Sequence, residues 1–184
     1  MIELGDEVHV WQAELSGREA AHGALREILG RYLDRPAAEI ELETGGRGKP
    51  RLPGEERLRF NLSHSGEIVA VAVTLDREVG IDVERIDPGR DVLKLAPRAL
   101  PPEDADAVAA SPPEERVALF HRAWARREAA AKCLGVGLAG HAAELSARDG
   151  KLSVAPLDFG PGYAAALAVA GEMPPLRRFD FEPQ

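Results

Sequence analysis

Three strand patterns follow one another in the middle of the chain with only short turns between them, and this succession constrains the fold more than any other feature. Leu58–Leu62 alternates apolar and polar residues, Ile68–Leu75 is a continuous apolar run rich in Val, and Val79–Glu84 alternates strictly. Short turns join antiparallel neighbours, whereas parallel neighbours need a long crossover. We therefore predict an antiparallel meander with at least one buried face.

A helix is predicted before these strands, between Ser16 and Pro36. Ser16 and Glu19 have the spacing of a capping box, apolar residues then recur at helical spacing, and Pro36 prevents the helix from continuing. The alternating segment Val8–Trp11 predicts an opening strand, and Thr44–Gly54, which is rich in Gly and Pro, predicts an ordered loop.

The second half of the chain repeats this order of helix and strands. The predicted elements there are short helices broken at Pro97 and Pro101, a long helix with a capping box at Ser111 and Glu114 that ends at Gly135 and Gly137, a hairpin turning at Asp149-Gly150, and a buried strand over Tyr163–Ala170. We therefore predict an α/β (α+β) protein of two similar helix-plus-meander halves, residues 1–88 and 89–184.

Charge and composition argue against several classes of partner. The 31 acidic and 23 basic residues give a formal net charge of −8, which disfavours a broad nucleic-acid surface. A single cysteine excludes an intrachain disulfide framework. The N-terminus lacks the basic and apolar regions of a secretory signal, and the longest apolar runs are too short to span a membrane. We expect a soluble cytoplasmic protein.

Two carboxylates share one face of the last predicted strand. Side chains alternate along a strand, so Gly80, Asp82 and Glu84 lie on the same side, and two residues of rise place the two acidic residues about 7 Å apart. Both could reach one ion, and Gly80 leaves room beside them. Taken alone, the triplet is better explained as a solvated acidic edge.

The long helix carries a matching set of residues. Trp124, Glu128 and Lys132 stand four apart and therefore line one helix face. A surface ion pair worth a few tenths of a kcal/mol is the common alternative. However, the chain has few lysines, and the neighbouring residues Ala129–Ala131 indicate a mostly buried helix. We therefore expect this Glu/Lys pair to line a cleft.

Two further polar segments are weak signals when taken singly. Gly46–Pro50 contains the cations Arg47 and Lys49 but lacks the spacing of a P-loop. Asn61–Gly66 ends a strand in a polar turn but is not the Gly-x-Ser-x-Gly turn of hydrolases. The scattered histidines have no zinc-ligand spacing, so a catalytic zinc is not expected.

In combination, the motifs resemble a known family. The segments Gly48–Pro50, Phe60–Gly66, Gly80–Glu84 and Trp124–Leu138 read GKP, FNLSHSG, GIDVE and W-x-x-x-E-x-x-x-K-x-x-G-x-G-L. In this order they resemble the 4′-phosphopantetheinyl transferase superfamily, specifically its longer, Sfp-like branch, over about half of the chain. The resemblance implies two halves related by a pseudo-twofold, with coenzyme A in the cleft between them. It also implies transfer of phosphopantetheine to a serine of a carrier protein of fatty-acid, polyketide or nonribosomal-peptide synthesis, with release of adenosine 3′,5′-bisphosphate.

The resemblance also implies a role for each site residue. Asp82, Glu84 and Glu128 would hold Mg²⁺, because attack on a pyrophosphate builds charge that a hard cation neutralises. Glu128 would also be the base for the serine, and Lys132 would bind the pyrophosphate. The 3′-phosphate of coenzyme A would be held by Arg47, Lys49 and His64, with Ser63 nearby.

The sequence departs from the family pattern in places. Ala125 stands where the family has a hydroxyl residue, Arg127 replaces a lysine, and the N-terminal region is short. Arg18, His22 or Arg26 could substitute for missing phosphate contacts, although a solvated helix face explains them as well. Arginines on the long helix are candidates to bind an acidic carrier, namely Arg122, Arg126 and Arg127.

These observations predict a monomeric, Mg²⁺-dependent transferase and leave two alternatives. One is a coenzyme A- or carrier-binding protein of the same fold that has lost turnover. The other is an unrelated Mg²⁺-dependent phosphohydrolase, which would release phosphate from coenzyme A without an acceptor. The three retained carboxylates favour the transferase.

Overall fold

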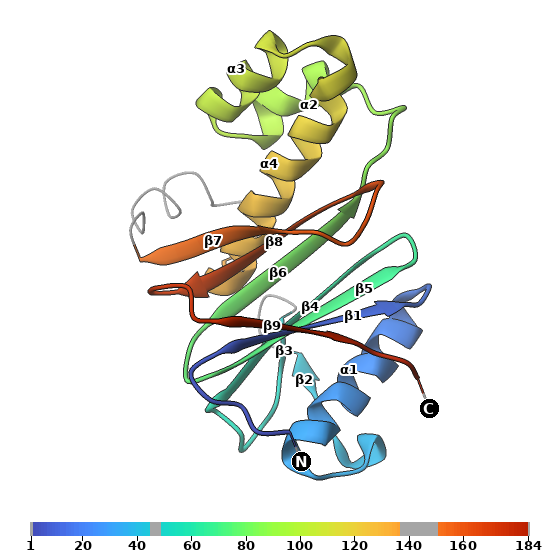
Figure 1. Ribbon diagram of the computed structural model, residues 1–184, viewed down its shortest axis with the longest axis vertical. Helices are drawn as coiled ribbons and strands as arrows, with labels where there is room; N and C mark the ends of the chain where they lie inside the picture. The colour runs from blue at the N-terminus through green and yellow to red at the C-terminus, as the bar shows by residue number, and fades with distance from the viewer. Residues whose placement is uncertain (1, 45–48, 137–150, 184) are drawn as a thin grey trace.

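Two β-sheets pack against each other, and a helix covers the outer face of each sheet (Figure 1). The computed structural model describes residues 2–44, 49–136 and 151–183. The first sheet has the order β4-β5-β1-β9, with bounds Leu58–Ser65, Ile68–Leu75, Val8–Glu14 and Leu176–Asp180. The second has the order β6-β8-β7, with bounds Val79–Arg85, Tyr163–Ala170 and Leu152–Leu157. A small ribbon pairs β2 (Glu43–Thr44) with β3 (Pro50–Arg51).

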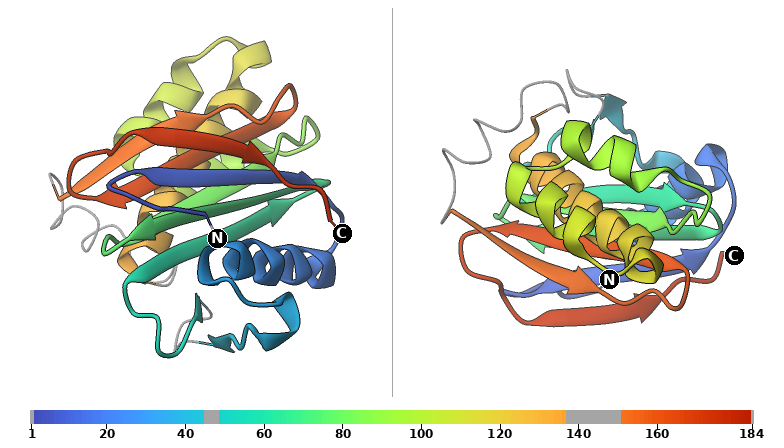
Figure 2. Two further views of the ribbon diagram at one scale, coloured as in Figure 1. Left: turned by 60° about the horizontal axis from the view of Figure 1, so that its bottom comes forward. Right: turned by 90° about the horizontal axis from the view of Figure 1, so that it is seen from above.

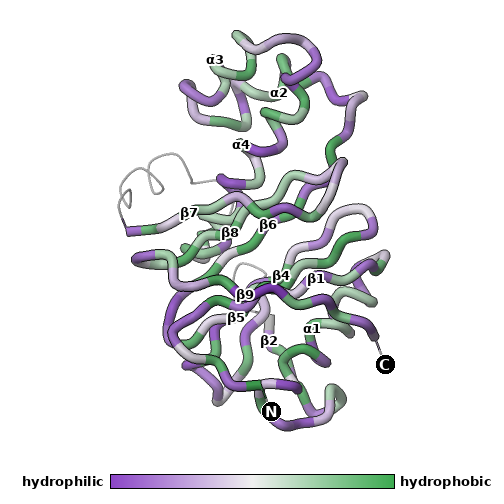
Figure 3. Tube along the Cα trace, viewed as in Figure 1, coloured by the Kyte–Doolittle hydropathy of each residue, from purple (hydrophilic) through white to green (hydrophobic). Residues whose placement is uncertain are grey.

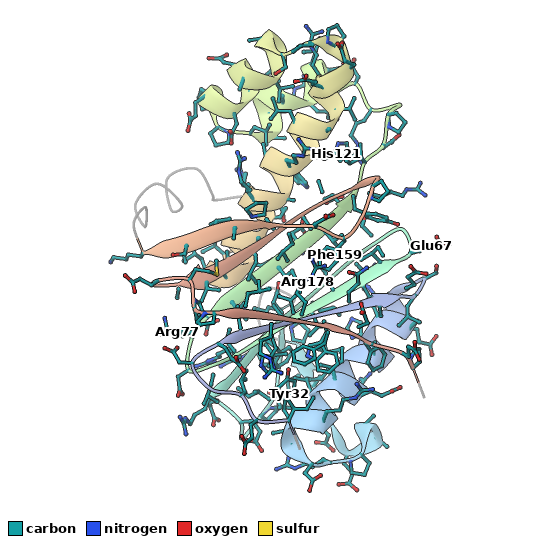
Figure 4. The ribbon with its side chains drawn as sticks, in the orientation of Figure 1. Tyr32, Glu67, Arg77, His121, Phe159 and Arg178 are labelled. Atoms are coloured by element: carbon teal, nitrogen blue, oxygen red, sulfur yellow. The ribbon has the colours of Figure 1, made fainter. Side chains whose placement is uncertain are left out.

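Helix α1 (Arg18–Leu33) covers the outer face of the first sheet. Its apolar residues Leu25, Ile28 and Leu29 are buried against Trp11 of β1 and the valines of β5. Tyr32 lies in this layer, where its hydroxyl accepts a hydrogen bond from the Trp11 indole (2.8 Å; Figure 4). A single turn of 3₁₀ helix, Ala37–Glu39, follows α1.

The inner faces of the two sheets form a second core. Val8 and Val10 from β1 and alternate residues of β5 meet Ile81 and Val83 from β6 and alternate residues of β8. Hydrophobic residues follow these strands in both sheets (Figure 3), and Phe159 lies between the sheets (Figure 4). Alternation of the side chains thus sends one face of β6 to this core and the other face toward α4.

Helix α4 (Pro113–Leu134) has two parts with different neighbours. Its second part packs on β6 and β8 through small residues, among them Ala125, Ala129 and Cys133. Its first part joins α2 (Val92–Ala99) and α3 (Pro102–Ala110) in a separate apolar cluster, which we call the helical cap. In Figure 2 the cap and α4 lie on the opposite side of the paired sheets from α1.

The predicted three-strand meander is wrong at its third strand. β4 and β5 pair as an antiparallel hairpin, with Phe60 opposite Val73, but β6 pairs with β8 in the second sheet. The reason is that both edges of β5 are already occupied, by β4 and by β1. The chain therefore crosses from one sheet to the other at the short turn before Val79.

Both predicted capping boxes are also wrong, although both helices are present. Gly17 is the N-cap of α1 and Pro112 is the N-cap of α4, and neither position has a side-chain cap. Ser111 instead ends α3, where its hydroxyl donates to the Ala107 carbonyl (2.7 Å). The predicted break at Pro97 is wrong as well, since this residue lies inside α2. Gly135 ends α4 in a left-handed conformation, as predicted.

The strand β9 was not predicted, and it changes how the two halves relate. It runs parallel to β1, with Arg178 opposite Val10, so the end of the chain returns to the first sheet. The first sheet thus takes a strand from residues 89–184, and the second takes β6 from residues 1–88. The division at residue 88 and the pseudo-twofold stay predictions. The hairpin turn at Asp149-Gly150 lies outside the described residues.

Among the described helices, none is both long enough and apolar enough to cross a membrane.

Candidate active site

The carboxylates of β6 face α4, as the alternation predicted. Val79, Ile81 and Val83 are buried in the core between the sheets, so Asp82 and Glu84 lie on the other side. The room that we expected beside them at Gly80 is filled, because a Cβ there would lie 2.1 Å from the Ala129 carbonyl oxygen. Gly80 therefore admits the α4 backbone and not an ion.

The two acidic motifs meet where α4 crosses β6. The Trp124 indole donates a hydrogen bond to Glu84 Oε1 (3.2 Å), and Lys132 Nζ donates to Asp82 Oδ1 (2.6 Å). Glu128 lies between them on the same helix face and is 8% exposed. The side chains that spacing alone grouped in two separate sets thus form one buried site.

Burial raises the pKa of each carboxylate in this site, and the charge of Asp82 adds to the effect at Glu84 and Glu128. Burial raises the pKa of Asp82, and the Lys132 ammonium opposes this effect. Burial and then the charge of Asp82 raise the pKa of Glu84. Burial, followed by the charge of Asp82, raises the pKa of Glu128 from its ordinary 4.5 to about 7, with Lys132 again opposing. The site is therefore short of positive charge.

Two oxygens in the site point to a cation. Asp82 Oδ2 and Glu128 Oε1 are buried and have no hydrogen-bond partner within the described part of the chain. Such groups are costly to bury, and carboxylate oxygens are ligands that hard divalent cations prefer. As placed, the residues described contain no set of three or more His, Cys, Asp and Glu side chains gathered closely enough to hold a metal. The donor chemistry therefore fits a cation, while Lys132 already binds the other oxygen of Asp82, Oδ1.

A ladder of side chains connects β4 to the free edge of β6, and sequence reasoning missed it. Asn61, Ser63 and Ser65 accept hydrogen bonds from the backbone N–H groups of Ile81 (2.8 Å), Val83 (3.3 Å) and Arg85 (3.0 Å). We call these three side chains the β4–β6 ladder. Polar residues at alternate positions in a strand that is otherwise apolar were the available signal.

Ser63 and His64 lie on opposite faces of β4. Ser63 faces β6 and contacts Asp82 and Lys132, whereas His64 is exposed on the α1 side. On that side, burial lowers the pKa of His22, and the positive charges of Arg26, Arg18 and His64 lower it further. Neighbours in a strand point in opposite directions, so these two residues are not brought to one phosphate.

Lys49 binds the protein itself. Its ammonium donates to Glu78 Oε2 (3.1 Å) and to the carbonyl oxygens of Val79 (3.1 Å) and Lys132 (3.2 Å), and an ammonium has only three protons to donate. It thereby fastens β6 to the end of α4. Lys49 also lines a cavity of about 550 Å³, together with Pro50, Leu58 and Glu78, among others. Arg47 lies outside the described residues.

The arginines of α4 mostly hold the helical cap. Arg126 pairs with Asp104 of α3 (3.0 Å), and Arg127 donates to the Ala99 carbonyl at the end of α2 (2.6 Å). The third arginine suggested for carrier binding, Arg122, is exposed, and the described residues show no contact between it and the helical cap. Ala125 is fully buried in a cluster of small residues that includes Ala166 and Ala168 of β8.

The chain is similar to enzymes of one family. The 4′-phosphopantetheinyl transferase superfamily (ACPS) matches residues 78–167. The 4′-phosphopantetheinyl transferase HetI of Nostoc sp. is 32% identical, over 91% of this chain and 90% of HetI. The 4′-phosphopantetheinyl transferases psf-1 of Bacillus pumilus and AcpT of Salmonella typhimurium are 35% and 36% identical, each over 67% of this chain and over 52% and 63% of their own lengths.

Proposed function

The chain belongs to the 4′-phosphopantetheinyl transferase superfamily, and from this premise we propose that it transfers 4′-phosphopantetheine from coenzyme A to a serine hydroxyl of a carrier protein. The observation that supports the proposal is that Asp82 and Glu128 each have a buried carboxylate oxygen without a hydrogen-bond partner among the described residues, beside the Lys132 ammonium that binds Asp82. Adenosine 3′,5′-bisphosphate is the other product. We propose that the enzyme is a monomer.

The site residues would divide the chemistry between them. Asp82, Glu84 and Glu128 would hold a divalent cation, proposed as Mg²⁺, which neutralises charge on the pyrophosphate oxygens. Without a bound cation, burial and the charge of Asp82 raise the pKa of Glu128 to about 7. A carboxylate positioned beside the serine hydroxyl would serve as its general base. It would take the serine proton as the serine oxygen bonds to phosphorus and the bond to the leaving phosphate breaks.

Lys132 would stabilise the leaving phosphate. Its ammonium is partly exposed, while its partner Asp82 is almost fully buried. A lysine acts on phosphate as a mobile point charge. The three protons of the Lys132 ammonium go to Asp82 Oδ1, the Ser63 hydroxyl and the Ile81 carbonyl. We propose that a pyrophosphate oxygen of coenzyme A replaces the Ile81 carbonyl, while the contacts to Asp82 and Ser63 stay in place.

We propose that His64, together with His22 and Arg26, binds the 3′-phosphate of coenzyme A. The positive charges of Arg26 and His64 act on His22 and lower its pKa after the larger effect of burial, and an anion beside these groups would relieve their mutual repulsion. His64→Ala should lower kcat/KM for coenzyme A about tenfold but change it less than twofold for 3′-dephospho-coenzyme A, because one charge-assisted hydrogen bond contributes about 1.5–3 kcal/mol. An equal loss with both substrates would contradict this assignment.

Mass spectrometry of carrier proteins tests the proposed activity. A panel of apo carriers from fatty-acid, polyketide and nonribosomal-peptide systems is incubated with the chain, coenzyme A and Mg²⁺. We expect at least one carrier to gain phosphopantetheine, and Glu128→Gln or EDTA to reduce the rate at least about a hundredfold. No modification in any carrier would contradict the proposal.

The inactive alternative makes a different prediction. A binding protein without turnover would bind coenzyme A in calorimetry and modify no carrier. The departures at Ala125 and Arg127 are accounted for by contacts with β8 and with the helical cap, and neither contact involves a site carboxylate. They therefore give no reason to expect loss of turnover.

A further inference from the structure

Ser63 differs from the other members of the β4–β6 ladder because it also binds both charged groups of the site. Its hydroxyl donates to Asp82 Oδ1 (3.0 Å) and accepts from Lys132 Nζ (3.0 Å) as well as from the Val83 N–H (3.3 Å). A hydroxyl has one proton to donate and two acceptor positions, so its capacity is filled. Ser63 is also only 6% exposed.

On the premise of the proposed transferase activity, we propose that Ser63 is a positioning residue that fixes the Asp82 carboxylate and the Lys132 ammonium against the β6 backbone. Its connections span three elements, since Ser63 lies on β4, Asp82 on β6 and Lys132 on α4. A single hydroxyl therefore sets the relative position of the residues that the reaction needs together.

Ser63 acts through the Asp82 carboxylate. Asp82 Oδ1 is held by two donors, the Ser63 hydroxyl and the Lys132 ammonium, while Oδ2 is buried without a partner among the described residues. Holding Oδ1 restricts rotation of the carboxylate and so determines where Oδ2 lies. Residues that orient a metal ligand in this way typically change metal affinity 10- to 100-fold when they are removed.

Ser65 offers a matched control for Ser63. It accepts from the Arg85 N–H (3.0 Å) in the same ladder, and the hydrogen bonds of the described residues link it to no carboxylate of the site. Ser65→Ala thus removes a ladder hydrogen bond alone, whereas Ser63→Ala removes a ladder hydrogen bond and the contacts to Asp82 and Lys132. A role of Ser63 in the fold only would make the two variants alike.

Two titrations without a carrier protein test the proposal. Mn²⁺ binding is measured by electron paramagnetic resonance, and coenzyme A binding is measured by calorimetry in EDTA. We expect Ser63→Ala to weaken Mn²⁺ binding about tenfold and coenzyme A binding less than about threefold, while Ser65→Ala changes both by less than about threefold. If Ser63→Ala does not fold, Ser63→Cys takes its place, because a thiol is only a weak donor and acceptor.

Either of two results would overturn the proposal. One is a tenfold loss of coenzyme A binding in EDTA with Mn²⁺ binding unchanged, which would make Ser63 a phosphate ligand. The other is an equal loss of Mn²⁺ binding in Ser63→Ala and Ser65→Ala. A wild-type chain that binds neither Mn²⁺ nor coenzyme A would instead contradict the proposed transferase function.

A double-mutant cycle in urea tests the positioning role even in that case. The variants are Ser63→Ala, Lys132→Met and their combination, each unfolded in EDTA. We expect the unfolding constant of the combination to differ at least about fivefold from the product of the single effects, since residues in one hydrogen-bond network couple. The pair Ser65→Ala and Lys132→Met should multiply within about twofold. Independent effects of Ser63 and Lys132 would overturn the proposal.

Discussion

At Gly80 the absence of a side chain determines how closely α4 approaches β6. A Cβ at this position would lie 2.1 Å from the Ala129 carbonyl oxygen and 2.4 Å from the Cys133 nitrogen. These are backbone atoms of a long helix, which cannot move individually. The close approach lets the Lys132 ammonium reach Asp82 and lets the Trp124 indole reach Glu84.

Gly80→Ala is therefore expected to lower the free energy of unfolding by about 3 kcal/mol, as overpacking in a close-packed core does. Urea unfolding followed by circular dichroism measures this change. Gly23→Ala is the control, because Gly23 lies inside α1 with no atom near the position of a Cβ, and it should stabilise the protein by about 0.5–1 kcal/mol. Equal effects of the two substitutions would contradict the tight contact at Gly80.

The raised pKa of Glu128 makes stability depend on pH. Folding raises this pKa from 4.5 to about 7, so the folded protein holds the proton more tightly than the unfolded chain. The stabilisation from protonated Glu128 is fully present below pH 4.5 and is lost as the pH rises through 7. A carboxylate whose pKa is lowered by folding destabilises the folded protein at acid pH. Glu128 has the opposite effect, because its protonation stabilises the folded protein.

In EDTA, the free energy of unfolding should fall by about 2–3 kcal/mol more in wild type than in Glu128→Gln between pH 5 and pH 8. Urea unfolding at each pH measures the difference. The exposed substitution Glu172→Gln should follow the wild-type curve. A parallel pH dependence of wild type and Glu128→Gln would refute the raised pKa.

At the scale of elements, the two parts of α4 have different packing partners. The C-terminal part packs on the second sheet and places Glu128 and Lys132 beside β6, and the N-terminal part packs with α2 and α3 in the helical cap. Arg126 and Arg127 connect the two parts, because they hold α3 and α2 to the helix directly before Glu128. Of the three arginines suggested for carrier binding, Arg122 is the exposed one that makes no contact with the helical cap in the described part of the chain.

Arg122→Glu should raise the KM for an acidic carrier several-fold, by about 1 kcal/mol of lost attraction, and leave the KM for coenzyme A within twofold. Steady-state kinetics with each substrate varied in turn measures both. Arg35→Glu serves as the control, since Arg35 follows the end of α1 in the chain, and α1 lies on the opposite side of the paired sheets from α4 (Figure 2). Equal changes in the two KM values would exclude Arg122 from carrier binding.

At the scale of the whole molecule, each sheet contains strands from both halves of the chain. β6, from residues 1–88, belongs to the second sheet, and β9, from residues 89–184, pairs with β1 in the first sheet. Phe179 of β9 stacks on Trp11 (4.5 Å), and Phe181 is 3% exposed and lies under the Arg31 guanidinium (4.9 Å). The end of the chain thus completes the core of the first sheet, and the side chain of Arg178 in β9 lies over Phe159 (Figure 4).

Phe181→Ala should lower the free energy of unfolding by about 3 kcal/mol, and unfolding should remain a single transition because neither sheet is built from one half alone. Urea unfolding monitored by Trp fluorescence and by circular dichroism measures both properties. Glu182→Ala, an exposed neighbour, should change stability by less than about 0.5 kcal/mol. Two separate transitions would show that the halves fold independently.

The sequence by itself determined which residues share a face. Periods of two and of 3.6 residues placed Asp82 beside Glu84 and Trp124 beside Glu128 and Lys132, and the turns and run lengths predicted most of the strands and α4. Such patterns depend only on local backbone geometry. The family resemblance then joined the two faces into one site.

Only the tertiary structure decided which faces and edges meet. β6 joined β8 because β1 and β4 already occupied both edges of β5, and this left the free edge of β6 to the side chains of β4. The tertiary structure likewise decided that Lys49 donates to the Val79 carbonyl of β6 and to the Lys132 carbonyl near the end of α4. Strand pairing depends on which hydrogen-bonding edges remain free when all strands have formed. Several strands compete for the same edge, and the local periodicity of a sequence does not show which of them pairs there.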